Sequence, residues 1–325
     1  MVTGGAGYIG SHAVLDLLER DRVIVVDNLC TGHRRLVPDH PNVRFVRADI
    51  SDRAALRPVF EEERVDAVMH FSAHAYVGES VTDPAKYYRN NVGATLALLE
   101  TMLEANVKQF VFSSTCSTFG HGSGKPIDED TPQLPINPYG FSKLMVEQIL
   151  RDFDQAYGLK SVVLRYFNAA GADPRGRAGE LHDPETHVIP LVLQAALGLR
   201  PSFSIYGTDY PTSDGTCVRD YIHVVDISQA HLLALEFLAR EGKSQSFNLG
   251  NGAGFSVREV IACAEDVAGA KIAIREAPRR PGDPAVLVAD ARRAKEVLGW
   301  RPAYSALELM IRHACDWLAR EPGGR

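Results

Sequence analysis

Hydrophobic residues in the first half of the chain alternate between short continuous runs and patterns with helical spacing. Apolar runs of about four to eight residues, bounded by Gly, Asp or Ser, are typical of strands buried on both faces of a parallel sheet. Such runs occupy residues 23–26, 43–46, 65–72, 110–114 and 161–166. Between them, apolar residues at every third or fourth position predict helices from residue 13, over 53–62, over 84–105 and from 138 onward. This alternation predicts an α/β fold with a doubly wound parallel sheet, the Rossmann arrangement.

The pattern changes after residue 166. Residues 168–190 are rich in Gly, Pro and Asp, which indicates a domain boundary. Further on, the sequence predicts helices over 189–199, 225–241, 257–268, 291–298 and 306–319, and strands over 203–206 and 246–249. We therefore expect a first domain over residues 1–168 and a smaller, mixed α/β substrate domain over 169–325. Residues 221–250 are expected to pack back onto the first domain.

Composition narrows the functional classes. The chain has 325 residues, of which 45% are hydrophobic and 23% are charged, and this is ordinary for a globular protein. A net charge of −6 argues against general affinity for nucleic acid. The five cysteines are scattered without a CxxC pair, which indicates reduced thiols in the cytoplasm. No apolar run approaches ~18 residues, and the opening Met-Val-Thr-Gly-Gly is not typical of a signal peptide, so neither a membrane span nor export is expected.

Three glycines at the start of the chain indicate a nucleotide site. Gly4, Gly7 and Gly10 precede a predicted helix, and such a turn lets backbone N–H groups approach a pyrophosphate. The strand 23–26 then ends in Asp27, where an acid can bind ribose hydroxyls. This carboxylate favours NAD over NADP, because it would repel a 2′-phosphate. The alternative is a similar turn without a ligand. Only Met1 and Val2 precede the turn, which leaves less than the ~5 residues usual for a central strand.

Other strand ends offer further cofactor contacts. Asp49 and Ile50 either border an adenine or form an ordinary loop. Residues 71–73, Phe-Ser-Ala, lie at the carboxyl end of a buried strand, where ligands bind in such sheets. Asn91, within the helix predicted over 84–105, bonds either a cofactor phosphate or buried backbone.

Tyr139 and Lys143 are the candidates for proton transfer. Four residues apart on a helix starting near Pro138, they share one face. A tyrosine that acts as a base at neutral pH needs its pKa lowered by roughly 3 units, about 4 kcal/mol. One positive charge about 4 Å away supplies that amount in a partly wet cleft but only about 1 kcal/mol in open water. The pair therefore needs a cleft and a second positive charge, such as an oxidised nicotinamide. The same spacing also occurs by chance in many helices.

A hydroxyl is expected opposite this pair. The strand 110–114 runs into Thr115, followed by Cys116, Ser117 and Thr118. At that position Thr115 can hydrogen-bond a substrate, although Ser and Thr in loops more often form turns.

Taken together, these motifs resemble the extended short-chain dehydrogenase/reductases. The glycine turn, Asp27, Ser113-Ser114-Thr115 and Tyr139-x-x-x-Lys143 carry the general resemblance. The chain is similar, more narrowly, to the UDP-glucose 4-epimerase family at residues 3–12, 27–29, 77–80, 137–139, 164–168, 210–216, 218–224 and 278–283. The resemblance covers nearly the whole chain.

The resemblance implies an isomerase that reversibly inverts C4 of UDP-hexoses, chiefly UDP-glucose and UDP-galactose, through a 4-keto intermediate. It implies tightly bound NAD and a homodimer formed through the helices over 84–105 and 138–157. The catalytic residues would be Tyr139, Lys143 and Thr115. The implied cofactor contacts are Gly4, Gly7, Tyr8, Ile9, Gly10, Asp27, Asn28, Asp49, Ile50, Phe71, Ser72, Ala73, Asn91, Ser113, Tyr139, Lys143 and Tyr166. In the family, the residue aligned with Leu287 limits bulky 2-N-acetyl groups, and a leucine there leaves N-acetylated sugars open.

The UDP-sugar contacts rest mainly on the resemblance. Because the chain is acidic overall, cations for a diphosphate must be concentrated locally, and Arg219 and Arg280 are the candidates. Further implied contacts are Thr115, Asn168, His187, Val188, Ile205, Tyr206 and Asp283. No metal is expected, because His187 has no second histidine at ligand spacing.

Three alternatives stay open. A sugar-nucleotide 4,6-dehydratase needs an acid pair beside Thr115, where this chain has Cys116 and Ser117. A UDP-glucuronate epimerase or decarboxylase differs mainly in contacts to a C6 carboxylate. The third alternative is an inactive NAD-dependent regulator, against which the complete set of Tyr139, Lys143 and Thr115 argues.

Overall fold

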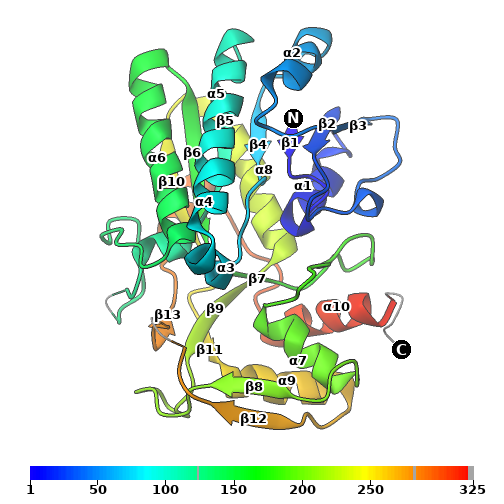
Figure 1. Ribbon diagram of the computed structural model, residues 1–325, viewed down its shortest axis with the longest axis vertical. Coiled ribbons are helices and arrows are strands. Elements are labelled where there is room, and N and C mark those ends of the chain that lie inside the picture. The colour runs from blue at the N-terminus through cyan, green and yellow to red at the C-terminus, as the bar shows by residue number, and fades with distance from the viewer. Residues whose placement is uncertain (123, 281–282, 321–325) are drawn as a thin grey trace.

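The computed structural model describes residues 1–122, 124–280 and 283–320. Its centre is a sheet of seven parallel strands in the order β10-β6-β5-β4-β1-β2-β3 (Figure 1). The strands are β1 (Val2–Thr3), β2 (Val23–Asp27), β3 (Val43–Arg47), β4 (Val68–His70), β5 (Gln109–Thr115), β6 (Lys160–Tyr166) and β10 (Gln245–Leu249). The doubly wound parallel sheet predicted from the sequence is confirmed.

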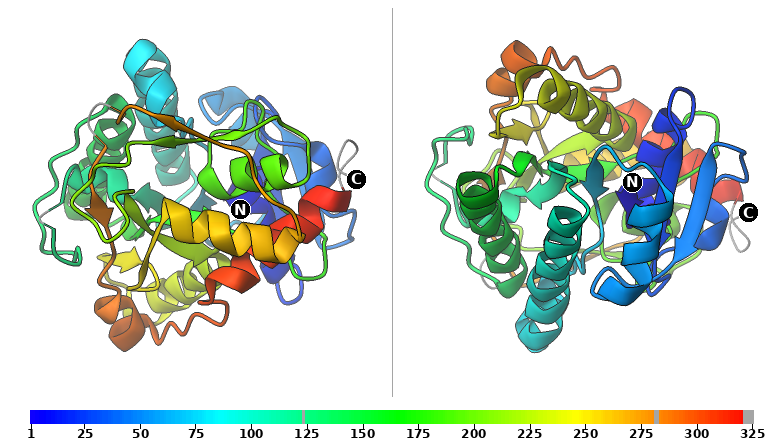
Figure 2. Two further views of the ribbon diagram at one scale, coloured as in Figure 1. Left: turned by 90° about the horizontal axis from the view of Figure 1, so that it is seen from below. Right: turned by 90° about the horizontal axis from the view of Figure 1, so that it is seen from above.

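Helices cover both faces of this sheet (Figure 2). Helices α1 (Tyr8–Leu17) and α8 (Val224–Glu241) pack together on one face, where Val14, Ala234 and Val25 belong to one buried cluster. Helices α2 (Arg53–Glu62), α5 (Thr95–Glu104) and α6 (Pro138–Tyr157) cover the other face around a second cluster. Strands buried from both sides explain the continuous apolar runs in the sequence.

Strand β1 is short yet central. Its two residues pair with β2 on one side and β4 on the other. Met1 extends the pairing, because its amino group donates to the Ala67 carbonyl (2.8 Å) and its carbonyl accepts from the Met69 amide (2.9 Å).

The helix predicted over 84–105 is divided. It consists of α4 (Pro84–Tyr87), a π-helical segment η2 (Tyr88–Ala94) and α5, and a separate short helix α3 (Val77–Thr82) precedes it. The π-helical segment contains Asn91, whose buried amide bonds to the loop after β4, and such widened turns often serve a local contact. Likewise the helix predicted over 291–298 is a π-helical turn, η4 (Ala294–Leu298), and the strand predicted over 65–72 is ordered only over β4. Two 3₁₀ turns, η1 (Arg34–Leu36) and η3 (Cys116–Phe119), have no counterpart in the predicted pattern.

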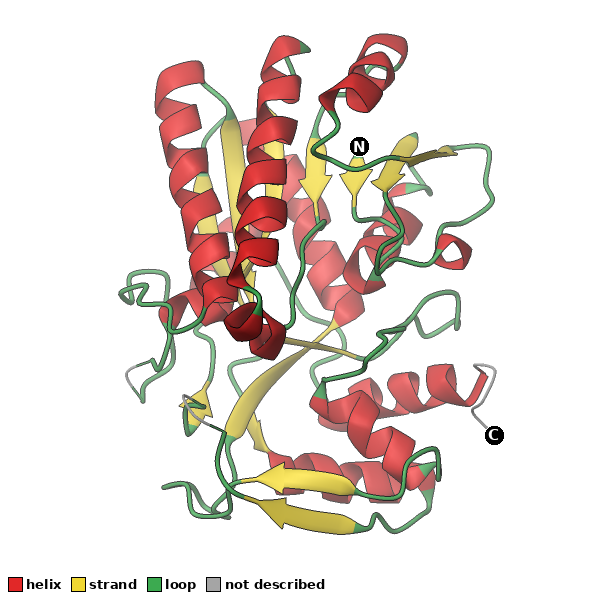
Figure 3. Cartoon of the chain, in the orientation of Figure 1, coloured by secondary structure: helices red, strands yellow, loops and turns green. Residues whose placement is uncertain are grey.

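A smaller lobe faces the carboxyl ends of the sheet strands (Figure 3). It contains a sheet in which β9 (Val218–His223) pairs with β7 (Asn168–Ala170), β11 (Gly254–Ser256) and β13 (Val286–Leu287). A two-stranded sheet of β8 (Phe203–Tyr206) and β12 (Ile274–Ala277) lies beside helices α7 (Val188–Ala196), α9 (Val257–Ala268) and α10 (Leu307–Arg320). These elements share one apolar core.

The chain crosses between the lobes more than once. Strand β9 runs directly into α8, and β10 then joins the large sheet beside β6. Farther along, Trp300 is fully buried and its indole donates to the Asp226 carbonyl in α8 (2.9 Å). Within the described part of the chain, every helix is too short or too polar to span a lipid bilayer.

Candidate active site

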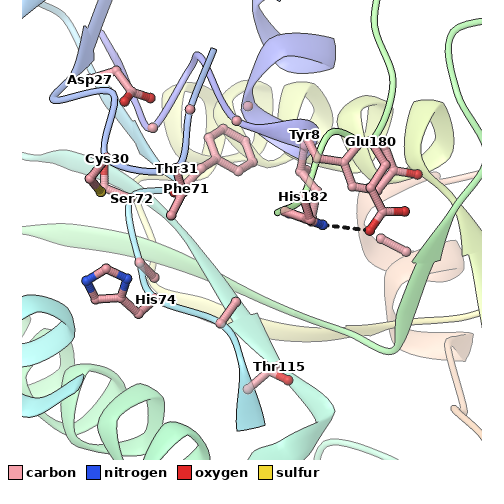
Figure 4. Close-up of a pocket in the computed structure, with 18 of the residues that line it drawn as sticks. Tyr8, Asp27, Cys30, Thr31, Phe71, Ser72, His74, Thr115, Glu180 and His182 are labelled. Carbon is pink, nitrogen blue, oxygen red and sulfur yellow. Dashed lines mark hydrogen bonds and ion pairs between the residues drawn. The ribbon is translucent and has the colours of Figure 1, made fainter. Parts of the chain in front are cut away.

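A cavity opens where the carboxyl ends of the large sheet meet the smaller lobe (Figure 4). This edge is the usual ligand site of open α/β sheets. Among the predicted site residues, the cavity is lined by Gly4, Gly7, Tyr8, Ile9, Gly10, Asp27, Asn28, Asp49, Ile50, Phe71, Ser72, Ala73, Thr115, Tyr139, Lys143, Tyr166, Asn168 and His187. The structure thus brings together residues that are far apart in the sequence.

The glycine turn joins β1 to α1 at the floor of the cavity. A side chain at Gly10 would place its Cβ 2.2 Å from the Gly4 carbonyl oxygen, so the turn can close this tightly only with glycine there. The first helical hydrogen bond of α1 runs from the Ser11 amide to the Gly7 carbonyl (3.0 Å). The amides that precede it, at the positive end of the helix, can donate to an anion in the cavity.

Asp27 connects the end of β2 to this turn. Its carboxylate accepts from the amides of Ala6 (3.0 Å) and Leu29 (2.8 Å). Burial raises the pKa of Asp27, although these two hydrogen bonds oppose the shift. Each carboxylate oxygen keeps a further lone pair, so Asp27 can also accept from ribose hydroxyls.

Asn28 and Asp49 form a second polar contact at the same edge. The Asn28 amide donates to Asp49 (2.7 Å), and Ser51 donates to the same carboxylate through its backbone and hydroxyl. Burial disfavours the charge, but these bonds outweigh it and hold the pKa of Asp49 below its usual value. Ile50 is buried beside it, which gives the apolar wall that an adenine would need.

The start of α6 places Tyr139 next to Thr115. Asn137 caps the helix by accepting from the Gly140 amide (2.8 Å). A Cβ on Gly140 would lie 2.5 Å from the Ser117 carbonyl oxygen, so glycine permits α6 to contact the segment after β5 this closely. Tyr139 and Thr115 consequently both line the cavity, and a side-chain hydrogen bond links them.

Lys143 lies one turn further along the same helix face. Its ammonium group donates to the Ser113 carbonyl (2.9 Å) and lies 4.8 Å from the centre of the Phe112 ring. Burial lowers the pKa of Lys143 to about 7, and the Glu147 carboxylate opposes part of that shift.

The electrostatics of Tyr139 differ from the sequence prediction. We expected Lys143 to lower the pKa of the phenol. Burial instead raises the pKa of Tyr139 above its usual range, nearby Tyr166 adds to the shift, and the hydrogen bond from Thr115 opposes it. Lys143 is held toward Ser113 and is itself costly to charge, which explains why the pair alone does not yield a phenolate.

Glu147 continues the stripe that Tyr139 and Lys143 begin. It is fully buried and forms an ion pair with Arg165 of β6 (2.7 Å). The Ser114 hydroxyl also donates to it (2.6 Å). These contacts fix α6 to the ends of β5 and β6, and therefore fix Tyr139 relative to Thr115.

Two predicted cofactor contacts lie behind the lining of the cavity. Asn91 bonds both the amide and the carbonyl of His74 (2.9 Å each) and the Ser142 hydroxyl (3.0 Å), which supports a role in holding backbone. Ser113 pairs its hydroxyl with His231 (2.9 Å), while its carbonyl holds Lys143.

The predicted UDP contacts extend from the cavity into the smaller lobe. Asn168 lines the cavity, and its amide donates to the Asp220 carbonyl (2.9 Å). Arg219 forms an ion pair with Asp283. The charge of Arg219 also acts on Cys116, a lining residue, so this arginine lies close to the cavity.

The remaining predicted contacts are farther out. Arg280 stacks on the exposed Tyr206 ring, 4.0 Å from its centre. The Ile205 side chain is buried in the core of the smaller lobe, so the prediction that it lines a base pocket is not supported for that side chain. Val188 begins α7 and packs against the same core. Leu287 is buried with Cys116 and Phe167, and Pro281 and Gly282 lie outside the described residues.

Sequence reasoning missed one group of lining residues. His182 lies beside His187, with ring centres 5.1 Å apart, and both rings contact Glu180. The expectation that His187 has no histidine partner was therefore wrong. His182 stands five residues before His187, and this spacing was a signal in the sequence.

The charges of this group are strongly coupled. Burial would lower the pKa of His187, but Glu180 and Glu185 outweigh it and raise the pKa to about 10. Burial would raise the pKa of Glu180, but the two histidines hold it at about 2. The group thus places paired charges at the edge of the cavity.

Comparisons with known proteins agree with this geometry. A model of the NAD dependent epimerase/dehydratase family matches residues 1–250. The UDP-glucose 4-epimerase of Halalkalibacterium halodurans is 53% identical over 325 residues, covering 100% of this chain and 96% of the relative.

Solved structures extend the similarity to the fold. The UDP-glucose 4-epimerase of Brucella ovis in complex with NAD has a TM-score of 0.94 and 48% identity, with 97% of this chain and 96% of that chain covered. The enzyme of Bifidobacterium longum in complex with NAD+ and UDP has a TM-score of 0.93 and 41% identity, with 100% and 99% covered. The resemblance read from the motifs is confirmed, and the chain belongs to the NAD dependent epimerase/dehydratase family.

Proposed function

We propose that the protein catalyses reversible, NAD-dependent epimerisation at C4 of UDP-hexoses, chiefly UDP-glucose and UDP-galactose. The observation that carries this proposal is one cavity in which Tyr139, Lys143 and Thr115 face the glycine turn and Asp27. The printed activity of relatives about half identical over the full chain supports the same reaction.

The residues of the cavity fit NAD. The glycine turn and the first amides of α1 suit a pyrophosphate, and Asp27 suits the adenosine ribose hydroxyls. Lys143 is placed to hold the nicotinamide ribose. When bound, NAD+ supplies a hydride acceptor at C4 of the sugar and a positive charge near Tyr139.

Tyr139 acts as the base and then as the acid. Its phenolate takes the proton of the C4 hydroxyl, and Thr115 donates a hydrogen bond to the reacting oxygen. Because burial raises the pKa of Tyr139, its ionisation depends on added positive charge in the closed site. The same phenol returns the proton once the opposite face of the 4-keto sugar is presented.

Inversion requires one half of the substrate to stay fixed while the other turns. Asn168, Arg219 and Asp283 are placed to hold UDP, with Arg280 at the outer end. The sugar is held mainly at its reacting oxygen, so it can rotate about its link to the diphosphate. The reaction is redox-neutral, and NAD is therefore expected to stay bound through many turnovers.

The chain is further proposed to form a homodimer through α6. Phe141 and Met145 lie four residues apart on α6 and are 42% and 43% exposed, although both are large and apolar. Ile136, just before the helix, is exposed as well. Apolar side chains gathered at one place on a surface favour contact with another protein surface.

The test uses UDP-galactose without added NAD. The purified protein should form UDP-glucose, and Tyr139→Phe should lose at least about 1,000-fold in kcat while keeping its NAD. Tyr157→Phe is the matched control, because Tyr157 is an exposed tyrosine at the far end of the same helix. Conversion that survives Tyr139→Phe, or accumulation of a keto sugar by the native protein, would contradict the proposal.

A further inference from the structure

The segment Glu180–His187 carries two histidines and two glutamates within eight residues. It lies between β7 and α7, at the edge of the cavity. Glu180, His182, Glu185 and His187 each direct a ligand atom inward, and these four atoms all lie within 4.8 Å of one another. The side chains of Glu180 and Glu185 are only 8% and 7% exposed.

We propose that these four side chains form a binding site for a divalent transition-metal ion of the Zn²⁺ type. The site would take the ion through the Nδ1 atoms of His182 and His187 and one oxygen each of Glu180 and Glu185. Two neutral imidazoles and two carboxylates are a complete tetrahedral set for Zn²⁺.

The distances are close to those that a metal needs. The Nδ1 atoms of His182 and His187 lie 2.8 Å and 2.7 Å from the same oxygen of Glu180. Glu185 lies 3.0 Å from His187 and 3.9 Å from His182. Ligands about 2.0–2.2 Å from a tetrahedral ion lie roughly 3.4 Å apart, so the four atoms need to move by only about 0.5 Å.

Charge and ligand type select the class of ion. Two buried carboxylates bring two negative charges into the site, and one divalent cation balances both. Imidazole nitrogens favour Zn²⁺ and its transition-metal neighbours over Mg²⁺ and Ca²⁺, which prefer oxygen ligands alone.

Surrounding contacts hold the segment in place. The His33 ring, in the loop after β2, bonds the Leu181 carbonyl (2.8 Å). The His182 ring packs edge-on against Tyr8 and Tyr76, with ring centres 6.3 Å and 5.8 Å apart. Figure 4 shows His182 and Glu180 joined beside Tyr8 at the cavity. A bound ion would therefore fasten the loop of the smaller lobe beside the glycine turn.

Zinc binding tests this directly. Untagged holoprotein is treated with EDTA, desalted and titrated with Zn²⁺ against a chromogenic chelator. We expect one ion per chain, and His182→Gln and His187→Gln should each weaken its Kd by at least about 100-fold. His121→Gln, which alters an exposed histidine elsewhere, should bind zinc as the native protein does.

Cobalt provides a second readout. Co²⁺ in the native protein should give the intense visible bands of tetrahedral coordination, and Glu185→Gln should weaken them. Circular dichroism without metal checks that each variant is folded. Weak zinc binding by the native protein, or binding that folded His182→Gln and His187→Gln variants retain unchanged, would overturn the proposal. Both results are independent of the epimerase test, because neither measures turnover.

Discussion

Proton transfer in this cavity depends on the environments of a few side chains. Tyr139 is disfavoured as a phenolate by burial, and Lys143 is disfavoured as an ammonium by the same burial. Thr115 opposes the shift of Tyr139, and the Ser113 carbonyl fixes Lys143. The site thus stores an electrostatic cost in the protein, which charge added by a bound cofactor would offset.

That cost predicts a trade between stability and activity at Lys143. Lys143→Met should abolish most turnover and raise the free energy of unfolding at neutral pH by about 1 kcal/mol, because a buried charge is removed. The folded pKa of about 7 lies below the ordinary value of 10.5, so native stability from this group is lost as pH falls from 10.5 to 7. The advantage of the variant should therefore grow over that range and level off below it.

Denaturant unfolding of both proteins at several pH values measures this difference. Lys108→Met, which alters an exposed lysine, should show no such trend. A Lys143→Met variant that is less stable than the native protein at neutral pH would refute the argument.

At this scale the sequence revealed what is local. Tyr139 and Lys143 share a face because of helix geometry, and Asp27 follows a strand by pattern alone. The direction of the Lys143 ammonium was not predictable, since it depends on the Ser113 carbonyl of a distant strand. The contact between His182 and His187 was missed because it was judged from His187 alone.

Helix α6 is the element that organises the site. Tyr139, Lys143 and Glu147 follow one another at intervals of four along one face. The first two reach the cavity, and the third is anchored to Arg165 of β6. The position of the phenol therefore depends on an ion pair two turns away.

Glu147→Gln tests this anchoring. It leaves Arg165, which is 5% exposed, buried without its counter-charge, and should lower the free energy of unfolding by about 3–5 kcal/mol. Glu147→Leu combined with Arg165→Met removes both charges and should recover most of the loss. Thermal unfolding of the holoprotein gives both values. Equal stability of the single variant and the native protein would show that the pair contributes nothing to anchoring.

Element boundaries were predictable where local signals are strong. Helix α9 begins at the residue after Ser256, which forms a capping box with Glu259, and it ends before Gly269. The break in the helix over 84–105 was not predictable, because it depends on Asn91 bonding a loop 17 residues earlier in the chain. Strand β7 was missed for the same reason, since its partner β9 lies about 50 residues away.

At the scale of the whole molecule, the two lobes divide the work. The large sheet offers the glycine turn, Asp27 and Tyr139, and the smaller lobe offers Arg219 and Asp283. The sequence predicted the fold class and the division near residue 168. The strand order and the several crossings between lobes follow from tertiary packing, such as that of Trp300 against α8.

The proposed dimer is tested by charge on α6. Phe141→Glu combined with Met145→Glu should convert the dimer to a monomer, because two charges would be desolvated at the interface. Light scattering during size-exclusion chromatography measures the mass. Leu199→Glu, at a similarly exposed leucine of the smaller lobe, should leave the mass unchanged. A native protein that runs as a monomer at micromolar concentration would contradict the dimer.

The central claim is that hydride leaves C4 and returns to it within one closed site. The most direct measurement uses UDP-galactose carrying deuterium at C4, in ordinary water and without added NAD. The account predicts UDP-glucose that retains the deuterium at C4, because a hydride held on a bound cofactor does not exchange with solvent. Product that has lost the label to water would contradict it, since it would mean that C4 gives up a proton instead.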